Sequence, residues 1–290
     1  MRIISKKYIK ELHCYEYKFL GIKLRIRNEN THLRSEIDSL REIINLYCDI
    51  TKAPVANGEK RRVQIECLKI AEKIKDIFDE NNLEYWLDFG SLLGAIRHKG
   101  FVPWDDDIDF SATRETIEKV LPLLKLNFEN SNYSVNLKAE NRCFFQIRIA
   151  SKTDKKVGVD IFPVDYYNKV FFDKKDVNIF NKKFQKARKQ IKRKFGHRKL
   201  NGQEIETARQ LIKKLTKNLL NREEQVSHSA LFYGLDYPCI TKIPLFAHET
   251  IFPLKKIDFE GVSFSCPNNV EKHLENLYGN YMKFPKSVEL

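Results

Sequence analysis

The segment Asp88–Phe110, DFGSLLGAIRHKGFVPWDDDIDF, decides how this chain folds. Glu84–Phe89 is apolar enough for a short strand, and a Gly-Ser step then leads into a helical pattern that ends at Gly100 and Pro103. The alternating residues DDDIDFSA predict a second strand. The segment therefore predicts a strand, a helix and a second strand. Four acids lie at the start of the second strand: Asp105, Asp106, Asp107 and Asp109.

The second strand places its acids on one side. Side chains at i and i+2 point the same way, so Asp107 and Asp109 share a face, and Asp105 joins them if the strand begins early. Ile108 and Phe110 face the opposite side and can pack in a core. Neighbouring carboxylates on a rigid strand repel each other unless a cation neutralises them. Because oxygen ligands suit Mg²⁺ or Mn²⁺, the pattern predicts a site for one of these ions.

The Gly-Ser step indicates where an anion could bind. A helix that starts at Ser91 presents free backbone N–H groups and the positive end of its dipole. Gly90 lets the chain approach a phosphate closely, and Ser91 adds a hydroxyl. Taken alone, the acids are equally typical of a helix cap or a polar turn, and a Gly-Ser pair is weak. Their order on a strand–helix–strand frame favours a catalytic cleft that binds phosphate and metal.

Composition restricts the partners and the compartment. The 290 residues carry a formal net charge of +13, which favours anionic partners. Six scattered cysteines form no Cys-x-x-Cys pair, so we expect reduced thiols. The first residues lack the apolar core of a secretory signal, and no run approaches the length of a membrane span. We expect a cytoplasmic protein, with peripheral contact to the inner face of the membrane as an open alternative.

Residues 1–57 are expected to form an N-terminal extension to a catalytic domain over residues 58–290. The alternation in FLGIKLRIR predicts a strand with one basic face, which is more typical of a soluble edge strand than of an anion-binding surface. A heptad pattern with spacings of four and three follows. Its members are Leu33, Ile37, Leu40, Ile44 and Tyr47. The pattern is short for a coiled coil, so we expect a helix docked on the domain, with a homodimer as the alternative.

The rest of the chain predicts an α+β fold with a mixed sheet flanked by helices. A helix over Arg61–Asn81 precedes the decisive segment, and the strands CFFQIRIA and VGVDIF follow it. A terminal β-hairpin and helix come after a helical hairpin over residues 174–222. Between Lys174 and Lys199 this hairpin has twelve Lys or Arg and one acid. It suits a phosphorylated acceptor or an anionic membrane; a solvated helix face is the alternative. Nucleic acid is disfavoured, because the aromatics lie on the apolar stripe.

The sequences GSLLGAIRHKGFVPWDDDIDF and VDIFPVD resemble the LicD family, which includes the fukutin-type transferases. The family belongs to the nucleotidyltransferase-fold superfamily, whose signature is Gly-Ser, Asp-x-Asp or Asp-x-Glu, and a third acid on a later strand. Fifteen residues, Leu92–Asp106, separate Ser91 from Asp107. This spacing is longer than in the wider superfamily and fits LicD proteins. The resemblance spans roughly Arg61–Pro285 and implies a nucleotidyltransferase-like fold.

The resemblance also implies roles for individual residues. Gly90 and Ser91 match the phosphate-binding step, and Asp107 and Asp109 match the metal-binding pair. Asp105 is a further candidate, either as a metal ligand or as a group that supports the ligands.

Two acids compete for the third position of the signature. Asp160 lies within the strand-like VGVDIF, whereas Asp165 follows Pro163 in what we expect to be a loop. We therefore assign the third acid to Asp160 and keep Asp165 as the rival. Arg97 and His98, later in the helix that follows Ser91, are candidates to neutralise a donor phosphate, although surface solvation explains them equally well.

The activity that the resemblance implies is transfer of a substituted phosphate. The donor would be CDP-linked, such as CDP-choline, and the acceptor a sugar hydroxyl of a glycan or lipid-linked glycan. Fukutin-type relatives use CDP-ribitol, and a CDP-glycerol donor is a further alternative. The rival reactions are true nucleotidyl transfer from a nucleoside triphosphate and, outside the enzymes, nucleic-acid binding by a decayed site.

Overall fold

The computed structural model describes residues 5–9, 14–19, 22–27, 29–138, 146–167, 174–196, 200–219, 230–236 and 245–284. Its contacts divide them into two compact units. One unit runs up to Lys52 and includes the segment that begins at Met282; the other runs from Ala53 to Tyr281. Among the described residues, no helix has the length and apolar character needed to cross a membrane.

The smaller unit contains a three-stranded antiparallel sheet in the order β1-β2-β3, followed by a helix. Its elements are β1 (Ser5–Ile9), β2 (Cys14–Phe19), β3 (Ile22–Arg27), α1 (Glu29–Tyr47) and the short 3₁₀ helix η2 (Ile50–Lys52). The edge position of β3 confirms the edge strand predicted from the alternation of FLGIKLRIR. The sequence analysis missed β1 and β2.

The larger unit is built on a mixed sheet in the order β10-β9-β8-β5-β4, with β7 and then β6 beside the first half of β8. Its strands are β4 (Trp86–Leu87), β5 (Ile108–Thr113), β6 (Tyr133–Lys138), β7 (Gln146–Ser151), β8 (Gly158–Tyr167), β9 (Ala230–Tyr233) and β10 (Leu245–Ala247). Strands β5 and β8 are parallel, whereas their other neighbours are antiparallel. The expected mixed α+β sheet is confirmed.

Two helices, α2 (Gly58–Glu80) and α4 (Arg114–Phe128), pack against β5 and β8 and against each other. Alternate residues of both strands enter this core, among them Ile108 and Phe110. Since strand side chains alternate between faces, Asp109 and Asp160 lie on the opposite face of the sheet. The core therefore fixes the direction in which the acids point.

That opposite face carries α3 (Phe89–His98), whose first residue packs its ring against Phe162 and Tyr233 at centroid distances of 5.1 and 4.8 Å. Further elements complete the unit. They are α7 (His248–Ile251), the hairpin of β11 (Lys255–Phe259) and β12 (Val262–Cys266), and α8 (Val270–Tyr278). Helix α8 contacts both α3 and α7. Helix α3 is thus held between the sheet and α8.

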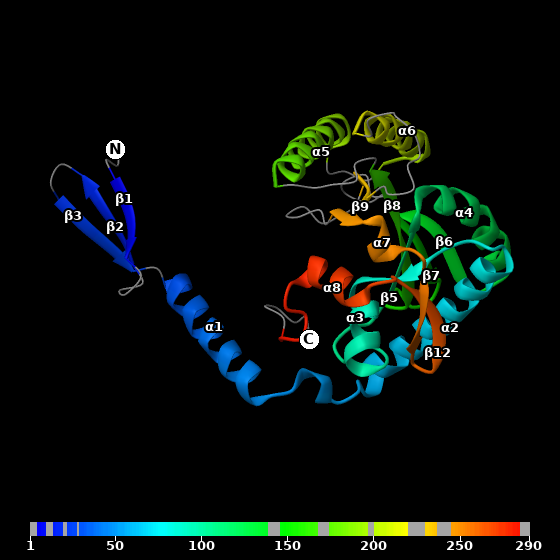
Figure 1. The fold of residues 1–290 in the computed structure, drawn as a ribbon, viewed down its shortest axis with the longest axis horizontal. Coiled ribbons are helices and arrows are strands. Elements are labelled where there is room, and N and C mark those ends of the chain that lie inside the picture. Colours follow the sequence, from blue (N-terminus) through cyan, green and yellow to red (C-terminus); the bar gives the residue numbers. More distant parts are fainter. Residues whose placement is uncertain are drawn as a thin grey trace. The chain divides into compact units, whose positions relative to one another are not determined.

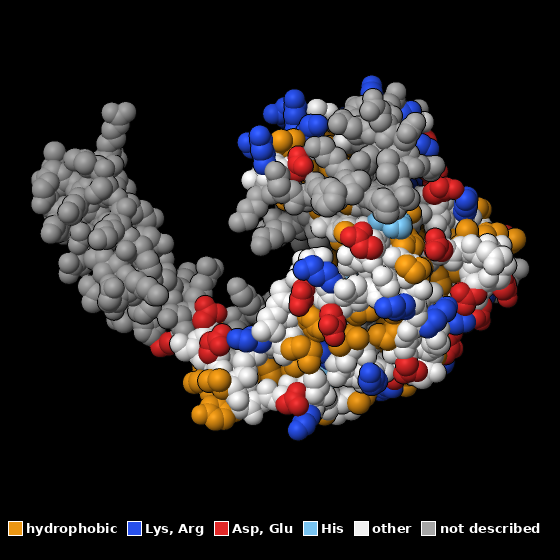
Figure 2. All heavy atoms as spheres, in the orientation of Figure 1, with side chains coloured by type: hydrophobic (Ala, Val, Ile, Leu, Met, Phe, Trp, Pro, Cys, Tyr) orange, Lys and Arg blue, Asp and Glu red, His pale blue; other side chains and the backbone are white. Residues whose placement is uncertain are grey.

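The helical hairpin predicted over residues 174–222 is present as α5 (Lys174–Phe195) and α6 (Gly202–Leu219), which lie side by side in Figure 1. Their apolar stripes, including Phe180 and Phe184, pack together with Phe232 of β9. Figure 2 shows Lys and Arg side chains gathered over α5 on the outer surface. The stripe is therefore core, and the basic residues form a solvent face.

One expectation about this fold was wrong. Asp165 lies within β8, which continues through Pro163 where we expected a loop. The strand tolerates a proline there because its two antiparallel neighbours on that edge pair with different halves: β7 with Gly158–Ile161 and β9 with Val164–Tyr167. Pro163 lies in the interval between them, where the missing N–H costs no antiparallel ladder bond.

Candidate functional site

Two neighbouring acids at the start of β5 meet a third acid from the distant strand β8. Asp109 and Asp160 are directly paired in the parallel register of β5 and β8, and Asp107 immediately precedes β5. One carboxylate oxygen from each residue can be chosen so that all three lie within 4.8 Å of one another. The structure therefore brings together the Asp107, Asp109 and Asp160 side chains that the sequence analysis selected.

The first turn of α3 lies against these acids. The Ser91 hydroxyl accepts a hydrogen bond of 2.9 Å from the backbone N–H of Asp109, so the helix and the strand are joined at the site. A Cβ atom on Gly90 would overlap with the Asp105 carboxylate. A side chain at position 90 would therefore displace the Asp105 carboxylate from the site. The Ser91 hydroxyl has a positioning role, because it holds the backbone of Asp109.

Helix α3 begins two residues earlier than we expected, because Asp88 caps it. The Asp88 carboxylate accepts a hydrogen bond of 2.8 Å from the N–H of Phe89. In the first turn, the amides of Gly90 and Ser91 have no acceptor within the helix. Phe89 itself has a φ of +45°, a strained value for a residue with a Cβ, which its ring contacts with the sheet hold in place. The helix start is thus a rigid, amide-lined corner.

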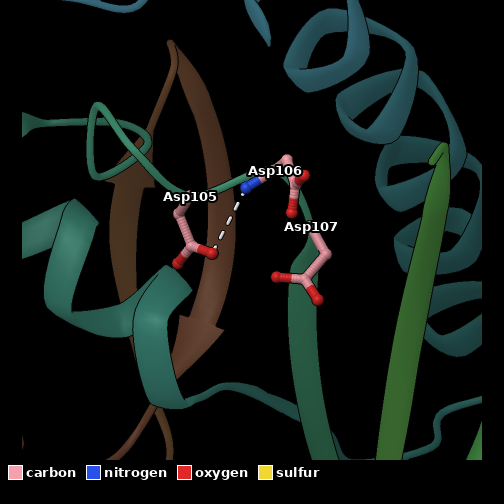
Figure 3. Close-up of side chains that lie close together, drawn as sticks. All are labelled: Asp105, Asp106 and Asp107. Carbon is pink, nitrogen blue, oxygen red and sulfur yellow. Dashed lines mark hydrogen bonds between the residues drawn. The ribbon is translucent and has the colours of Figure 1, made fainter. Parts of the chain in front are cut away.

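A second group of acids overlaps the first. Asp105, Asp106 and Asp107 also offer carboxylate oxygens within 4.8 Å of one another. In Figure 3, the Asp105 carboxylate lies beside the start of α3, and it accepts a hydrogen bond of 3.2 Å from the Asp106 N–H. Asp106 is exposed, whereas Asp105 and Asp107 are partly buried. Asp105 is therefore placed between the Gly90 corner and Asp107, as a ligand or as a support for one.

The family comparison agrees with this geometry. Residues 82–207 match the model of the LicD/FKTN/FKRP nucleotidyltransferase domain. This match supports membership of the LicD family. The matched segment contains α3, β5 and β8, and with them every acid of the cluster. The resemblance noted in the sequence is therefore confirmed at the level of the family.

Curated relatives of this LicD-family protein differ in how much of each chain they share with it. The lipopolysaccharide cholinephosphotransferase LicD of Haemophilus influenzae is 26% identical over 250 residues, which cover 78% of this chain and 92% of that protein. The human ribitol 5-phosphate transferase FKRP is 38% identical over 47 residues, or 16% of this chain and 10% of that protein. The uncharacterized protein RT0683 of Rickettsia typhi is 30% identical over 125 residues, which cover 39% of this chain and 40% of that protein.

The acids of this LicD-family site perturb one another strongly. Burial, and then the negative charges of Asp105 and Asp160, raise the pKa of Asp107 to about 7. Burial and the charge of Asp107 hold the pKa of Asp109 well above its ordinary value, and burial raises that of Asp105. Such crowding of acids is costly without a counter-charge and is typical of functional sites.

The donor set fits a hard divalent cation. All candidate ligands are carboxylate oxygens, which Mg²⁺ and Mn²⁺ prefer. The Asp160 Oδ1 atom is buried and has no hydrogen-bond partner among the residues that the structure describes. A buried acceptor without a donor is unfavourable, and a bound cation would satisfy it. Asp107, Asp109 and Asp160, with Asp105 beside them, are the residues that could hold the ion.

Arg148 is a site residue that the sequence analysis missed. It lies opposite Asp160 in the antiparallel pair of β7 and β8, and its Nη1 donates a hydrogen bond of 2.5 Å to Asp160 Oδ2. The guanidinium passes over Gly158, where a Cβ would lie 2.7 Å from Nη2. The contact fixes the orientation of the Asp160 carboxylate. A basic residue inside the apolar strand QIRIA was the signal that could have revealed it.

The rival third acid has a different environment. Asp165 accepts hydrogen bonds of 2.7 and 2.8 Å from Arg114, which also binds Asp236 at 2.8 and 3.0 Å. This buried ion cluster joins the start of α4 to β8 and to the turn after β9. Asp165 is outside the group of acids that meet Asp107 and Asp109. Its contacts are those of a structural residue.

Arg97 and His98 lie at the other end of α3 from the phosphate corner. Both belong to the last turn, so Arg97 is about 9 Å along the helix axis from Ser91. Arg97 is buried; burial lowers its pKa, and the nearby Tyr278 and Tyr281 oppose that shift. The His98 ring is 6.5 Å from that of Trp104. The structure does not bring these two side chains together with Gly90 and Ser91.

Proposed function

We propose that this protein transfers a substituted phosphate, of the phosphocholine type, from a CDP-linked donor to a sugar hydroxyl of a glycan or its lipid-linked precursor. Family membership supports the coarser statement, a phosphate transferase that modifies a glycan. The choline-like donor rests on the cholinephosphotransferase relative, most of whose length this chain covers. A CDP-alditol donor is the alternative, because the chain also matches the ribitol 5-phosphate transferase FKRP over a short segment.

The observation that carries the proposal is the convergence of Asp107, Asp109 and Asp160 beside the first turn of α3. In the proposed reaction, these three carboxylates hold one or two Mg²⁺ or Mn²⁺ ions. A bound divalent ion neutralises phosphate charge and stabilises the entering and leaving oxygens. Phosphoryl transfer demands positioning and charge neutralisation rather than covalent chemistry from the protein, which suits a site of rigid acids.

The remaining groups of the site bind and orient. The amides of Gly90 and Ser91 bind a donor phosphate at the positive end of α3. Arg148 holds Asp160 in its orientation, and Ser91 holds Asp109 through the backbone. The acceptor hydroxyl attacks phosphorus as CMP leaves, and its proton passes to a carboxylate of the cluster.

The basic face of α5 is proposed to attract the acceptor or the anionic surface that carries it. The last turn of α5 carries three basic residues, Lys192, Arg193 and Lys194. The apolar stripe of the helix is packed in the core, so its aromatics are not available to stack on nucleobases. This arrangement favours a phosphorylated glycan or lipid over nucleic acid.

A donor screen tests the proposal. Purified protein with Mg²⁺ or Mn²⁺ is incubated with CDP-choline, CDP-ribitol, CDP-glycerol and CTP, and release of CMP or pyrophosphate is measured. We expect CMP from one CDP-linked donor, and loss of release in Asp107→Asn and Asp109→Asn. Asp76→Asn, an exposed acid on α2, is the matched control and should retain full release. Pyrophosphate from CTP would instead establish nucleotidyl transfer, and wild-type turnover in either site variant would refute the assignment.

A further inference from the structure

The acidic segment, residues 105–107, has an irregular backbone. It lies between a turn at residues 103–104 and the first residue of β5, in neither a helix nor a strand (Figure 3). Its carbonyl groups therefore have no helix or sheet pattern to join, although buried backbone groups in proteins are almost always paired. Its carboxylates also crowd together and repel one another. Contacts from outside the segment are needed to hold it in shape.

Helix α2 donates hydrogen bonds to the carbonyl groups at the start of this segment. Lys60 Nζ donates one of 2.9 Å to the Trp104 carbonyl, and Gln64 Nε2 donates one of 2.8 Å to the Asp105 carbonyl. Gln64 is fully buried, which is rare for a glutamine without such partners. Arg61 Nη1 donates to Gln64 Oε1 at 3.3 Å. Because an arginine can only donate, this bond directs the Nε2 end of the amide at the acidic segment.

The thiol of Cys67 makes the third contact. Its Sγ donates to the Asp106 carbonyl at 3.5 Å and accepts a hydrogen bond of 3.3 Å from the Gly158 N–H. Gly158 is the first residue of β8, the strand that carries Asp160. Three successive carbonyl groups thus receive donors from one face of α2, at spacings of four and three residues. We call these donors the donor row: Lys60, Gln64 and Cys67.

We propose that the donor row positions the metal-binding carboxylates. It fixes the backbone from which Asp105 and Asp107 project, and through Gly158 it ties that backbone to β8. The inference rests on the proposed function, because it concerns the same metal ligands. The members of the row are positioning residues, since their hydrogen bonds reach the backbone of the segment. Groups that support metal ligands from behind commonly change metal affinity ten- to a hundredfold.

A purely structural contact would have a different effect. Apolar residues such as Ile70 and Ile74 already hold α2 in the core, so the helix does not depend on the donor row to stay in place. Lys73, also on α2, donates a hydrogen bond of 2.7 Å to the Asn127 carbonyl near the end of α4, away from the acids. Loss of a structural contact lowers stability alone. Loss of a positioning contact lowers metal affinity in a protein that is still folded.

The affinity of the metal-free full chain for Mn²⁺, measured from the EPR signal of the free ion, tests this role. Gln64→Met removes the donor, keeps the length of the side chain and leaves the charge of the site unaltered. We expect its dissociation constant for Mn²⁺ to be about tenfold higher than that of the wild type. Thermal unfolding, measured beside binding, checks that the variant is folded.

Cys67 and Cys266 provide a matched pair of buried thiols. Cys266 lies in β12 among apolar residues, including Leu92 and Leu274. Cys67→Ala should weaken Mn²⁺ binding about fivefold, less than the glutamine change because a thiol is a weak donor. Cys67→Ser, whose hydroxyl can donate and accept, should bind Mn²⁺ more tightly than Cys67→Ala. Cys266→Ala should lower stability and leave Mn²⁺ binding unchanged.

These outcomes separate the positioning role from the proposed function. Weaker binding in Gln64→Met and Cys67→Ala, with normal binding in Cys266→Ala, supports the positioning role. Wild-type affinity in both Gln64→Met and Cys67→Ala, or equal weakening in Cys266→Ala, would overturn it and leave the metal site of the proposed function standing. A wild-type protein that binds no Mn²⁺ would overturn both. If Gln64→Met does not fold, the cysteine variants decide alone.

Discussion

Asp109 and Asp160 lie directly opposite each other on the parallel strands β5 and β8. Their side chains point to the face of the sheet away from the α2 and α4 core, where Asp107 joins them. The pairing register therefore assembles the acidic site: a shift of one residue in either strand would turn one of the acids into the core. The stability of the sheet and the geometry of the site depend on the same register.

The Asp107 carboxyl is expected to destabilise the metal-free protein. Its folded-state pKa is raised to about 7 by burial and neighbouring acids, so the native state retains a proton that the unfolded chain loses near pH 4. The free energy of unfolding should therefore fall as pH rises from about 4 to about 7. At pH 8, Asp107→Asn should increase the unfolding free energy of the metal-free protein by roughly 1–3 kcal/mol. Its melting temperature should rise accordingly. Calorimetry with EDTA measures this change.

The same variant should lose the response to metal. Mn²⁺ is expected to stabilise the wild-type protein more at pH 8 than at pH 6, because the acids must be deprotonated to bind it. Asp107→Asn should show little gain at either pH, while Asp76→Asn should behave as the wild type. Equal metal stabilisation of wild type and Asp107→Asn would contradict the assigned site.

Gly90 and Gly202 provide a matched pair of glycine substitutions. Gly90→Ala pushes the Asp105 carboxylate, the movable end of a side chain, out of its place, so we expect a loss below about 1 kcal/mol in stability but a marked drop in CMP release. Gly202, the first residue of α6, has open space around its Cβ position, and Gly202→Ala should be neutral or slightly stabilising. Urea denaturation and CMP release are measured for both. An active, fully stable Gly90→Ala protein would show that Asp105 is not needed in this position.

Asp160 and Asp165 should differ in what their removal changes. In Asp160→Asn, the amide oxygen can still accept the hydrogen bond from Arg148. This variant should therefore lose CMP release, with only a small change in melting temperature. Asp165→Asn breaks a buried ion cluster with Arg114 and Asp236, and should cost about 3–5 kcal/mol. Thermal unfolding and CMP release, measured on both variants, separate the two roles. The reverse pattern, with Asp165→Asn stable but inactive, would make Asp165 the third acid.

The cap of α3 is expected to depend on His273. Asp88 is fully buried, and its carboxylate forms hydrogen bonds with five described residues: Trp86, Phe89, Ser111, Tyr233 and His273. Burial alone would raise the pKa of Asp88, but the charge and hydrogen bond of His273, with the other donors, lower it. A lowered carboxyl pKa contributes stability above the ordinary pKa, and this contribution is lost as pH falls through the folded-state value.

His273→Gln should therefore weaken the protein and make it more sensitive to acid. We expect a loss of about 2–4 kcal/mol at pH 7 and acid unfolding that begins at a higher pH than in the wild type. Urea denaturation between pH 3 and pH 7 measures both effects. An unchanged acid midpoint in the variant would show that His273 does not control the Asp88 charge.

Local features of the fold were readable from residue patterns. The helical hairpin followed from the spacing of Phe180, Phe184 and their neighbours, and Gly196 ended its first helix as expected. The start of α3 was misplaced, because Asp88 and Phe89 were taken as the last two residues of a strand and not as the cap and first residue of the helix. Two strands of the small unit, β1 and β2, were missed: β1 lacks the clean alternation of β3, and the alternation of β2, with Tyr15, Tyr17 and Phe19 on one face, was overlooked. Caps and weakly patterned strands depend on contacts that residue types alone do not specify.

By itself, the sequence determined the strand–helix–strand order around Gly90 and Ser91, the acids of the next strand and the heptad pattern of α1. These depend on periods of two, three and four residues, which the chain carries locally. Tertiary structure alone decided that Asp160 pairs with Asp109 while Asp165 pairs with Arg114, and that Arg148 crosses Gly158 to reach Asp160. The physical reason is that the register between distant strands is set by the packing of the whole core, which no local period encodes.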